Sequence, residues 1–485
     1  MPLMIRLGEI TLKSSRTRWR FESILVKNIM DALKREGFDE YSVSRERGRI
    51  FIYFKNEDLE EKAQEVLKRV FGITSISRVK ETSFQSLEDI VLDAEKYFKK
   101  HVEGKLFAVR ARRTGEHPFT SMDIARKVGA VLLRYAKGVN LNQPEVEVHI
   151  EVRGSKAYFF KDIVKAYGGL PIGSEGKVVA LVSGGFDSAV AAWYLLKRGA
   201  QVDYVFCNIG GLAHKVGVLS VVKILAEKWS YGYNPRLHII PFSRIIKEIT
   251  SKTEEGVFNV ILKRFMYRVA EKLAKEHGAK AIVTGESLGQ VSSQTLQNLY
   301  VSSLAVDLQI LRPLIGFDKE EIMAKAREIG TYNASSLMEE YCALYAGRPK
   351  TRVPLSLVQR EEEKLDVATL VEEAVEKKET VDILSIEAPS IEKLIVPRPP
   401  PQSIVIDIRS PEEYKAWHYP GSINIPFMEL YGELKNLDKN KVYVLYCETG
   451  SISLEAAYIM REKGFEAYSL KKGVRGARRS CPTTR

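Results

Sequence analysis

The stretch Val178-Val179-Ala180-Leu181-Val182-Ser183-Gly184-Gly185-Phe186-Asp187-Ser188 decides the fold of the middle of the chain. Its first five residues form a continuous apolar run, which is typical of a strand buried on both faces of a parallel sheet. A glycine turn follows at once, and Ala189 to Arg198 continues with the pattern of a helix. This order predicts an anion site, because backbone N–H groups and the positive end of the helix dipole face the same point.

The six residues Ser183 to Ser188 also carry a more specific signal. They contain neither the lysine-bearing loop of Walker type nor the spaced glycines of a dinucleotide site. The order Ser-Gly-Gly-Phe-Asp-Ser resembles the PP-loop of ATP pyrophosphatases, which cleave ATP between the α- and β-phosphates and adenylate a substrate. The alternative is a tight serine-rich turn that only links a strand to a helix.

The residues that follow predict the rest of one doubly wound domain. Further strands are expected at Asp203 to Asn208, Leu237 to Pro241 and Ala281 to Thr284, with helices between them. Parallel strands place their ligand site at their carboxyl ends, so Gly285 to Ser287 and Gln290 to Gln294 are expected to face the loop. Lys263 and Arg264, on the helical stretch Val260 to Ala270, are candidate cations for phosphates, and solvated side chains are the alternative.

Composition and charge point to a folded chain with a polyanionic partner. The 485 residues are 45% hydrophobic and 28% charged, which predicts several globular domains and excludes disorder, collagen-like repeats and a disulfide scaffold. The net charge of +12 comes from 74 basic and 62 acidic residues. Residues 1–170 hold 32 basic and 24 acidic residues, whereas 355–394 hold 5 and 11 and the last fifteen residues hold six and none. The surplus favours nucleic acid as a partner.

The spacing of the cysteines and the lack of a long apolar segment predict the cellular compartment of the protein. The four cysteines are Cys207, Cys342, Cys447 and Cys481, and they form no CxxC pair for zinc or an iron–sulfur cluster, so no metal site is expected. No segment has the length and apolar character of a membrane span or a signal peptide. We therefore expect a cytoplasmic protein without membrane contact, in which a disulfide would belong to a catalytic cycle.

The first third predicts two small α+β units. The first has a strand at Leu3 to Ile10, a helix at Trp19 to Glu36 and strands around Tyr41 to Phe54. The second has a strand at Leu106 to Arg110, a basic turn at Arg112 to Gly115, a helix at Ser121 to Tyr135 with Ser121 as N-cap, and strands at Glu145 to Val152 and Ala157 to Phe160.

The last block, beyond the polyproline run Pro397 to Pro401, has a sulfur-transfer pattern. The segments Ile404 to Tyr414 and His418 to Pro426 resemble the signature of rhodanese domains. A strand at Val442 to Tyr446 delivers Cys447 to a loop before a helix, where converging N–H groups stabilise a thiolate or a persulfide. A buried core cysteine is the alternative. Many rhodanese loops carry an arginine after the cysteine, whereas Glu448 to Ser453 has none, which leaves the choice of sulfur donor open.

The order of these blocks resembles one family over nearly the whole chain. Phe107 to Arg113, Gly115 to Ala125, Asn142 to Pro144 and Val146 to Val152 look like a THUMP domain. Thr284 to Thr295 and Glu340 to Cys342 are specific strings of the tRNA 4-thiouridine sulfurtransferases, a family also linked to sulfur supply for the thiamine thiazole ring. The fold class expected is multidomain α/β and α+β, with ferredoxin-like (1–59), THUMP (60–165), doubly wound PP-loop (174–380) and rhodanese-like (402–482) domains and a linker at 381–401.

The resemblance implies a two-step reaction. ATP, with Mg²⁺, would adenylate O4 of a tRNA uridine at position 8, and Asp187 and Lys319 match residues required for that step. A cysteine desulfurase would load a persulfide on Cys447, Cys342 would close a Cys342–Cys447 disulfide, and a reductant would reset both cysteines. Cys207 is expected in the core and Cys481 to be incidental. The implied nucleotide contacts are Leu181, Val182, Ser183, Gly184, Gly185, Ser188, Lys263, Gly285 and Gln294.

The remaining expectations concern partners and rival functions. Phosphate contacts position RNA without reading bases, and the candidates are Arg16, Arg18, Arg20, Arg110, Arg112, Arg113, Arg126 and Lys127. The acidic segment Leu355 to Leu394 is either a tether for the last domain or a helical face packed on the PP-loop domain. A homodimer is expected from the family. The rival functions are a PP-loop enzyme that adenylates another substrate, and a non-catalytic sulfur carrier or tRNA-binding adaptor.

Overall fold

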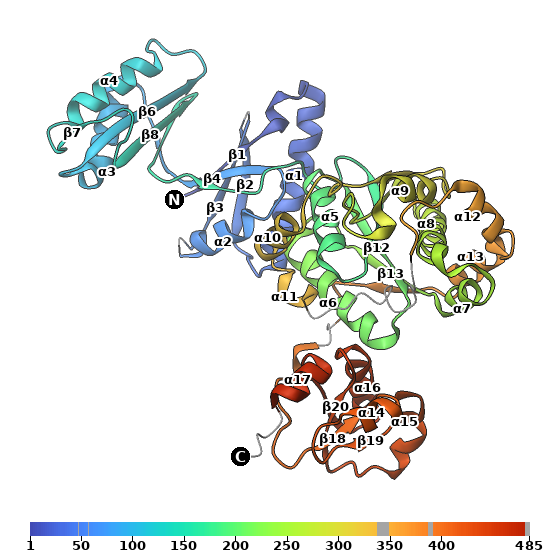
Figure 1. The fold of residues 1–485 in the computed structure, drawn as a ribbon. Helices are drawn as coiled ribbons and strands as arrows, with labels where there is room; N and C mark the ends of the chain where they lie inside the picture. Colours follow the sequence, from blue (N-terminus) through green and yellow to red (C-terminus); the bar gives the residue numbers. More distant parts are fainter. Residues whose placement is uncertain (47, 57, 337–348, 387–390, 481–485) are drawn as a thin grey trace. The chain divides into compact units, whose positions relative to one another are not determined.

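A computed structural model describes residues 1–46, 48–56, 58–336, 349–386 and 391–480 (Figure 1). The chain divides into two compact units. The first holds Met1–Glu175 with the short pieces Lys197–Gly199 and Tyr231–Tyr233, and the second holds the rest. Each unit contains two of the four sheets found among the described residues. No helix in the described part of the chain is both long and apolar enough to cross a membrane.

The N-terminal sheet is antiparallel and has the order β10-β4-β1-β3-β2. Its strands are β1 (Leu3–Leu7), β2 (Tyr41–Glu46), β3 (Arg49–Phe54), β4 (Ile73–Arg78) and β10 (Val164–Lys165), with η1 (Glu9–Leu12), α1 (Ser15–Arg35) and α2 (Leu59–Leu67). Helix α1 buries Phe21, Leu25, Ile29 and Leu33, which recur every fourth residue and so form one face of the helix. That face packs on the sheet residues Ile5 and Ile52 to make the core.

The second sheet mixes parallel and antiparallel pairs in the order β5-β9-β8-β6-β7. Its elements are β5 (Lys80–Ser83), α3 (Leu87–Val102), β6 (Leu106–Thr114), α4 (Ser121–Leu132), β7 (Gly138–Val139), β8 (Val146–Arg153) and β9 (Lys156–Phe160). The expected basic turn is wrong, because Arg112 and Arg113 continue β6 and pair with β8. The N-cap of α4 is Thr120 and not Ser121, since Thr120 Oγ1 accepts a hydrogen bond from Asp123 N and forms a capping box.

The third sheet is the doubly wound one. Its order is β15-β14-β11-β12-β13-β16, and all neighbours are parallel except β16, which runs antiparallel to β13 at the edge. The strands are β11 (Lys177–Leu181), β12 (Gln201–Asn208), β13 (Arg236–Pro241), β14 (Ala281–Val283), β15 (Gln309–Leu311) and β16 (Glu379–Asp382). The helices are α5 (Phe186–Lys197), α6 (Gly211–Trp229), α7 (Ser243–Lys252), η2 (Glu255–Val257), α8 (Phe258–Glu276), η3 (Ser292–Gln294), α9 (Leu296–Ser303), α10 (Lys319–Ile329) and α11 (Tyr332–Ser335).

Among its described residues, the acidic segment Leu355 to Leu394 contains two α-helices and the edge strand β16 of the third sheet. Helices α12 (Leu355–Glu362) and α13 (Val367–Glu376) bury Val358, Leu370, Val371 and Ala374 in the core that also contains α8. Their acidic side chains pair with basic ones of the same domain, as Glu362 does with Arg264 and Arg268. Of the two alternatives for this segment, packing on the domain is the one the structure shows for α12 and α13.

The fourth sheet is parallel and has the order β17-β21-β20-β18-β19. Its elements are η5 (Ile391–Leu394), β17 (Ile395–Val396), β18 (Ile404–Asp407), α14 (Pro411–Ala416), β19 (Ile423–Asn424), α15 (Phe427–Glu433), η6 (Leu434–Asn436), β20 (Val442–Tyr446), α16 (Ser451–Glu462), β21 (Glu466–Leu470) and α17 (Gly473–Ser480). Strand β17 falls in the range expected as a linker. It joins the sheet because its two β-branched residues pair with Ser469 and Leu470 of β21.

The two candidate caps of α4 differ in what their removal should do. Replacing Thr120 with alanine removes the acceptor for Asp123 N, which should destabilise the first turn by about 1 kcal/mol. Hydrogen exchange at the first amides of α4 should then be about fivefold faster. Ser121→Ala is the control and should leave the exchange rates of these amides unchanged. Equal effects of the two substitutions would contradict the capping assignment.

Candidate active site

The first part of the site is the loop between β11 and α5, Ser183 to Ser188, which we call the phosphate loop. Gly184 has φ 81°, a left-handed conformation that favours glycine. The hydroxyl of Ser188 closes the loop on itself, since it accepts from Ser183 N at 3.3 Å and donates to Gly185 O at 3.2 Å. The turn therefore presents the backbone N–H groups at the start of α5, where the helix dipole favours an anion.

The chain after β14 passes directly against the phosphate loop at Gly285. A Cβ atom at this glycine would lie 2.5 Å from the carbonyl carbon of Asp187 and 2.6 Å from the nitrogen of Ser188. Both are backbone atoms, so the clash could not be relieved by a side-chain rotation. The absence of a side chain at Gly285 therefore sets how closely the two loops approach.

Asp187 brings three separate elements together at the phosphate loop. Its carboxylate accepts hydrogen bonds from Lys319 Nζ at 2.8 and 3.0 Å and from Gln290 Nε2 at 2.9 Å. Lys319 is the first residue of α10, and its ammonium group is also 5.6 Å from the ring centroid of Phe186. The two residues expected to act in adenylation are thus in direct contact, at the place where an anion would bind.

A buried carboxylate lies beside this centre. Glu286, which is 4% exposed, accepts four hydrogen bonds. The donors to its Oε1 are Lys263 Nζ at 2.6 Å and Tyr267 Oη at 2.7 Å. The donors to its Oε2 are Thr284 Oγ1 at 2.9 Å and Arg312 Nε at 2.6 Å. Lys263 is therefore held by Glu286 and has only part of its hydrogen-bonding capacity left for a nucleotide.

The charges around Glu286 keep it ionised despite its burial. Burial alone would raise its pKa, but Lys263 and Arg312 outweigh this effect and lower the pKa from 4.5 to about 2. Burial together with the neighbouring Glu286 charge raises the pKa of Tyr267 well above its ordinary value, so the phenol stays a donor. The result is a fixed, charged cluster directly after Gly285 in the chain.

The buried residue His214, on α6, contacts the first residue of the phosphate loop. It is 3% exposed, and burial lowers its pKa to about 4, so the ring is neutral at neutral pH. Its Nε2 is 3.0 Å from the carbonyl oxygen of Ser183. Because a carbonyl can only accept, this nitrogen carries the proton and donates it to the first residue of the loop.

The other expected nucleotide contacts include two residues just before the phosphate loop and one after Gly285. Leu181 ends β11 half-buried, and Val182 is buried and donates its N–H to Val205 O at 2.9 Å. The side-chain amide oxygen of Gln294 accepts a hydrogen bond from Ser287 N at 3.1 Å. Gln294 therefore also shapes the loop that follows Gly285.

Cys447 forms a second site at the carboxyl end of β20. Its side chain is buried, and Gly450 N donates a hydrogen bond to its Sγ at 3.1 Å. Gly450 has φ 113°, which turns the loop so that this N–H points back at the sulfur. The hydroxyl of Ser453 lies 3.6 Å from the same sulfur. A thiolate or persulfide at Cys447 would thus be met by the N–H of Gly450 at the start of α16.

An arginine does approach this loop, from a distant part of the chain. Arg409 donates to both oxygens of Asp407, at 3.0 and 2.7 Å, and to Trp417 O at 2.7 Å. Its remaining nitrogen donates to Glu448 Oε2 at 3.3 Å. The guanidinium group is therefore used to hold the loop at Glu448.

The remaining cysteines divide into one core residue and two outside the described residues. Cys207 is 6% exposed on β12 and belongs to the core of its domain, as expected. Cys342 and Cys481 lie outside the described residues, as do Glu340 and Tyr341. The expected pairing of Cys342 with Cys447 stays a prediction.

Comparison with known proteins places these features in one family. The family model Thiamine biosynthesis protein (ThiI) matches residues 173–367, and the ThiI ferredoxin-like domain matches 2–77. The THUMP domain matches 84–162 and the rhodanese-like domain 391–479. A tRNA sulfurtransferase of Desulfurococcus amylolyticus is 41% identical over 483 residues, which are 99% of this chain and 98% of that protein. The chain belongs to the tRNA sulfurtransferase family.

Other members and solved structures agree. The tRNA sulfurtransferases of Pyrobaculum aerophilum and Escherichia coli are 40% and 39% identical, over 97% and 96% of this chain and 96% and 98% of theirs. The crystal structure of a 4-thiouridine synthetase–RNA complex with bound ATP has a TM-score of 0.68 and 34% identity, and covers 78% of this chain and 98% of that one. The expected fold class, with its four kinds of domain, is confirmed.

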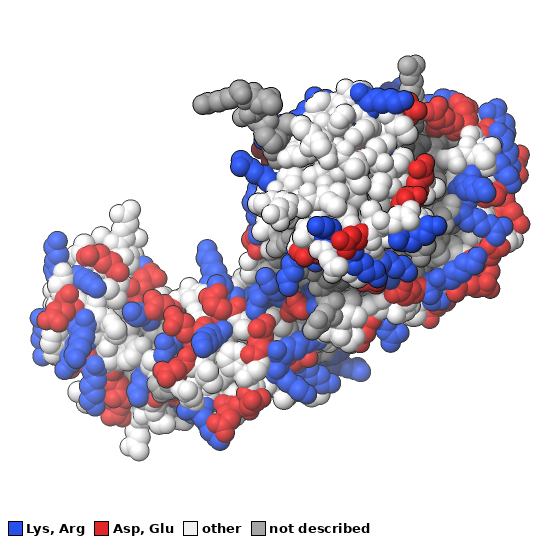
Figure 2. Space-filling model, turned by 90° about the horizontal axis from the view of Figure 1, so that it is seen from below, with Lys and Arg blue, Asp and Glu red and all other residues white. Residues whose placement is uncertain are grey.

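The residues that are expected to contact RNA differ in whether their basic groups are already engaged within the protein. Arg110 pairs with Glu147, Lys127 with Glu88, and Arg18 donates to Thr11 O and Lys13 O. The exposed residues Arg16, Arg20, Arg112 and Arg126 and the half-buried Arg113 complete the set. On the face drawn in Figure 2, basic and acidic atoms are intermixed. The expected RNA contacts therefore stay a prediction, with the exposed arginines that form no ion pair among the described residues as the strongest members.

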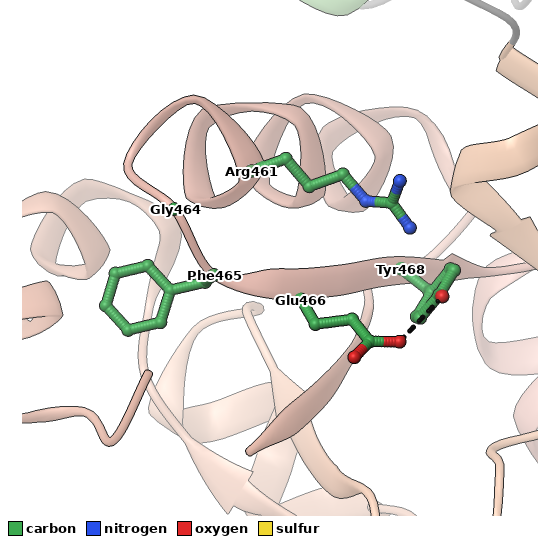
Figure 3. Close-up of a pocket in the computed structure, with 5 residues that line it drawn as sticks. All are labelled: Arg461, Gly464, Phe465, Glu466 and Tyr468. Atoms are coloured by element: carbon green, nitrogen blue, oxygen red, sulfur yellow. Dashed lines mark hydrogen bonds between the residues drawn. The ribbon is translucent and has the colours of Figure 1, made fainter. Parts of the chain in front are cut away.

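A hollow in the fourth sheet is separate from both sites. It has a volume of about 520 Å³ and is lined by Arg461, Gly464, Phe465, Glu466 and Tyr468 (Figure 3). Its polar groups bind one another, since Tyr468 donates to Glu466 at 2.9 Å and Arg461 lies over the ring of Tyr468. It lies at the start of β21, whereas Cys447 follows the opposite end of the parallel strand β20.

Sequence reasoning missed the roles of Glu286, His214 and Arg409. The sequence predicts that the string around Glu286 faces the phosphate loop, but no local pattern marks its carboxylate as an acceptor for four donors. His214 is a lone histidine in an apolar helical stretch, a pattern that is typical of a core residue. Its contact with Ser183 O distinguishes His214 from such a residue.

The Glu286 cluster predicts a pH-dependent contribution to stability. Glu286→Gln should lower the free energy of unfolding by about 3–5 kcal/mol, because the charges of Lys263 and Arg312 lose their buried partner. A carboxylate with a lowered pKa stabilises the fold above pH 4.5, and this contribution is lost as the pH falls toward 2. The gap in melting temperature between wild type and variant should therefore be constant from pH 7 to about 5 and narrow below it.

The matched control for Glu286→Gln is Glu320→Gln, at an exposed carboxylate on α10. Its melting temperature should follow that of the wild type at every pH. A gap for Glu286→Gln that grows as the pH falls below 4.5 would contradict the assignment of Glu286 as an ionised, paired group.

Proposed function

We propose that this protein catalyses the ATP-dependent transfer of sulfur to a uridine of tRNA, at position 8, to give 4-thiouridine. The contact of Asp187 with Lys319 on the phosphate loop carries the proposal, because it joins two residues 132 positions apart at 2.8 Å. The related synthetase in complex with RNA and ATP supports both substrates. A purely non-catalytic adaptor would leave this centre without a purpose.

In the first step the uridine is activated. The phosphates of ATP would lie on the N–H groups of the phosphate loop, beside the ammonium group of Lys319, which Asp187 holds there. O4 of the uridine attacks the α-phosphate, and pyrophosphate leaves with the electrons of the bond that breaks. Lys319 offsets the negative charge that develops on the phosphates, and Asp187 holds its ammonium group in place. The oxygen at C4 then leaves later as part of AMP.

Magnesium is expected to accompany ATP. The described residues contain no cluster of three acidic, histidine or cysteine side chains that could hold a metal ion alone. Both oxygens of Asp187 already accept hydrogen bonds from Lys319 and Gln290, so Mg²⁺ would be held mainly by phosphate oxygens and water, which are common ligands of this ion in nucleotide sites. When bound, the ion would neutralise phosphate charge.

In the second step sulfur replaces the activated oxygen. A cysteine desulfurase transfers sulfane sulfur to Cys447 as a persulfide. Either this persulfide attacks C4, AMP leaves, and Cys342 attacks the Cys447 sulfur to release 4-thiouridine, or Cys342 first releases sulfide, which attacks C4. Both routes end in a Cys342–Cys447 disulfide, and a two-electron reductant restores the thiols. The release of sulfide would also suit a second role in thiamine thiazole synthesis, which the family description favours.

The adenylation centre predicts a sharp loss of thiolation. Unmodified tRNA is incubated with the protein, ATP, Mg²⁺, cysteine and a cysteine desulfurase, and 4-thiouridine is measured by nucleoside analysis. Asp187→Asn and Lys319→Gln should each lower the rate by about 100-fold or more, as expected when one group that stabilises developing charge is lost. Lys325→Gln, on the same helix but paired with Glu328, should stay within about twofold.

Two results would contradict the adenylation step. One is the absence of 4-thiouridine with the wild-type protein, and the other is an undiminished rate with Asp187→Asn. Pyrophosphate release, measured in parallel, should fall together with thiolation in both variants.

The role of Cys447 predicts a bypass by sulfide. Cys447→Ala should abolish thiolation that is fed by the desulfurase, because no persulfide can form. A high concentration of inorganic sulfide should restore 4-thiouridine, since sulfide can attack the adenylated uridine directly. Cys207→Ala is the control for loss of a buried thiol and should retain the desulfurase-fed reaction. Full desulfurase-fed activity in Cys447→Ala would refute the persulfide role.

A further inference from the structure

The end of the fourth domain carries a dense basic surface. Between residues 471 and 480 there are five basic side chains and no acidic one, namely Lys471, Lys472, Arg475, Arg478 and Arg479, which we call the basic face. All five are exposed. None forms an ion pair with a carboxylate of the described residues, in contrast to surface cations such as Arg244 and Lys272.

The basic face results from the packing of α17. This helix buries Val474 and Ala477 in a core with Tyr446 and Leu470. Arg475 and Arg479 are one helical turn apart and so share the opposite, solvent side. Their exposure is thus fixed by the apolar contacts of the same helix. Arg478 is also oriented, since its guanidinium carbon lies 5.0 Å from the ring centroid of Trp417.

The basic face adjoins the loop that holds Cys447. Val474 N donates to the carbonyl oxygens of Cys447 and Glu448, at 3.0 and 3.1 Å. A Cβ atom at Gly473 would lie 2.4 Å from Cys447 O, so only glycine allows this approach. Lys472, just before it, has φ 67°, a conformation that costs a side chain about 1 kcal/mol. The backbone is therefore constrained to place this turn against the cysteine loop.

We propose that the basic face binds the phosphate backbone of tRNA while Cys447 delivers its sulfur. The inference rests on the proposed function and adds a second RNA contact, on the sulfur-carrying domain itself. Three of its five members are arginines, whose planar guanidinium groups match phosphate oxygens in a two-pronged contact. A polyanion would thereby be drawn to the one end of this domain at which the sulfur is held.

The test is a charge reversal in the full-length chain. Arg475→Glu with Arg479→Glu should slow desulfurase-fed thiolation by about tenfold or more at a tRNA concentration below KM, and weaken the salt dependence of that rate by about two units of the log–log slope. Arg475→Gln with Arg479→Gln should give a smaller loss in the same direction. The matched control is Lys435→Glu with Lys441→Glu, which are exposed and lie before β20, at the end opposite to Cys447. Its rate should stay within about twofold.

Two further measurements decide between the possible partners. Thiolation driven by sulfide should be equal in all these proteins, because it does not need Cys447. Persulfide loading of Cys447 by the desulfurase, measured without tRNA, should also be unchanged. A loss of persulfide loading would overturn the RNA contact and assign the basic face to the desulfurase. Equal desulfurase-fed rates in the charge-reversal variant and the control variant would overturn the RNA contact as well. Failure of the wild type to thiolate tRNA would contradict the proposed function. The basic face would still be tested in that case, because the salt dependence of tRNA binding can be compared between the wild type and the charge-reversal variant.

Discussion

The close approach of Gly285 to the peptide between Asp187 and Ser188 is the constraint on which the activation site depends. Two backbones meet there without an intervening side chain. This contact fixes the loop after β14 against the start of α5. It lets Gln290 reach the carboxylate of Asp187, to which α10 adds Lys319. A larger residue at Gly285 would move two parallel strand ends apart, and with them the groups that are expected to face the phosphates.

The Glu286 cluster makes that approach rigid. Its carboxylate is joined to α8 through Lys263 and Tyr267, and to the end of β15 through Arg312. A buried charge is stable only when its hydrogen-bonding positions are filled, and four donors fill those of Glu286. His214 does the same for the first carbonyl of the phosphate loop without adding charge. The phosphate loop is thus held from two sides before any substrate binds, which lowers the reorganisation that catalysis would otherwise require.

Structural features that depend on consecutive residues could be predicted from the sequence. Contacts between residues that are far apart in the chain could not. The phosphate loop and the position of Cys447 follow from a strand, a short turn and a helix start, all within about ten residues. The Glu286 cluster joins residues 23 and 26 positions apart, and Arg409 meets Glu448 across 39 positions. No local pattern specifies such pairs. The cap of α4 was misplaced by one residue, because Thr120 and Ser121 are both good caps and only the hydrogen bond to Asp123 N separates them.

The two chemical sites use the same structural device for different ends. In each, a buried parallel strand ends in a loop with a left-handed glycine, and a helix begins directly after it. At the phosphate loop the first helical turn carries Asp187, which recruits the cation Lys319, so the site suits a multiply charged phosphate. At Cys447 the N–H of Gly450 meets a single sulfur atom, and the guanidinium of Arg409 is held by the carboxylates of Asp407 and Glu448. The geometry of the loop provides the anion site in both cases, and the charge brought in from other elements decides which anion it fits.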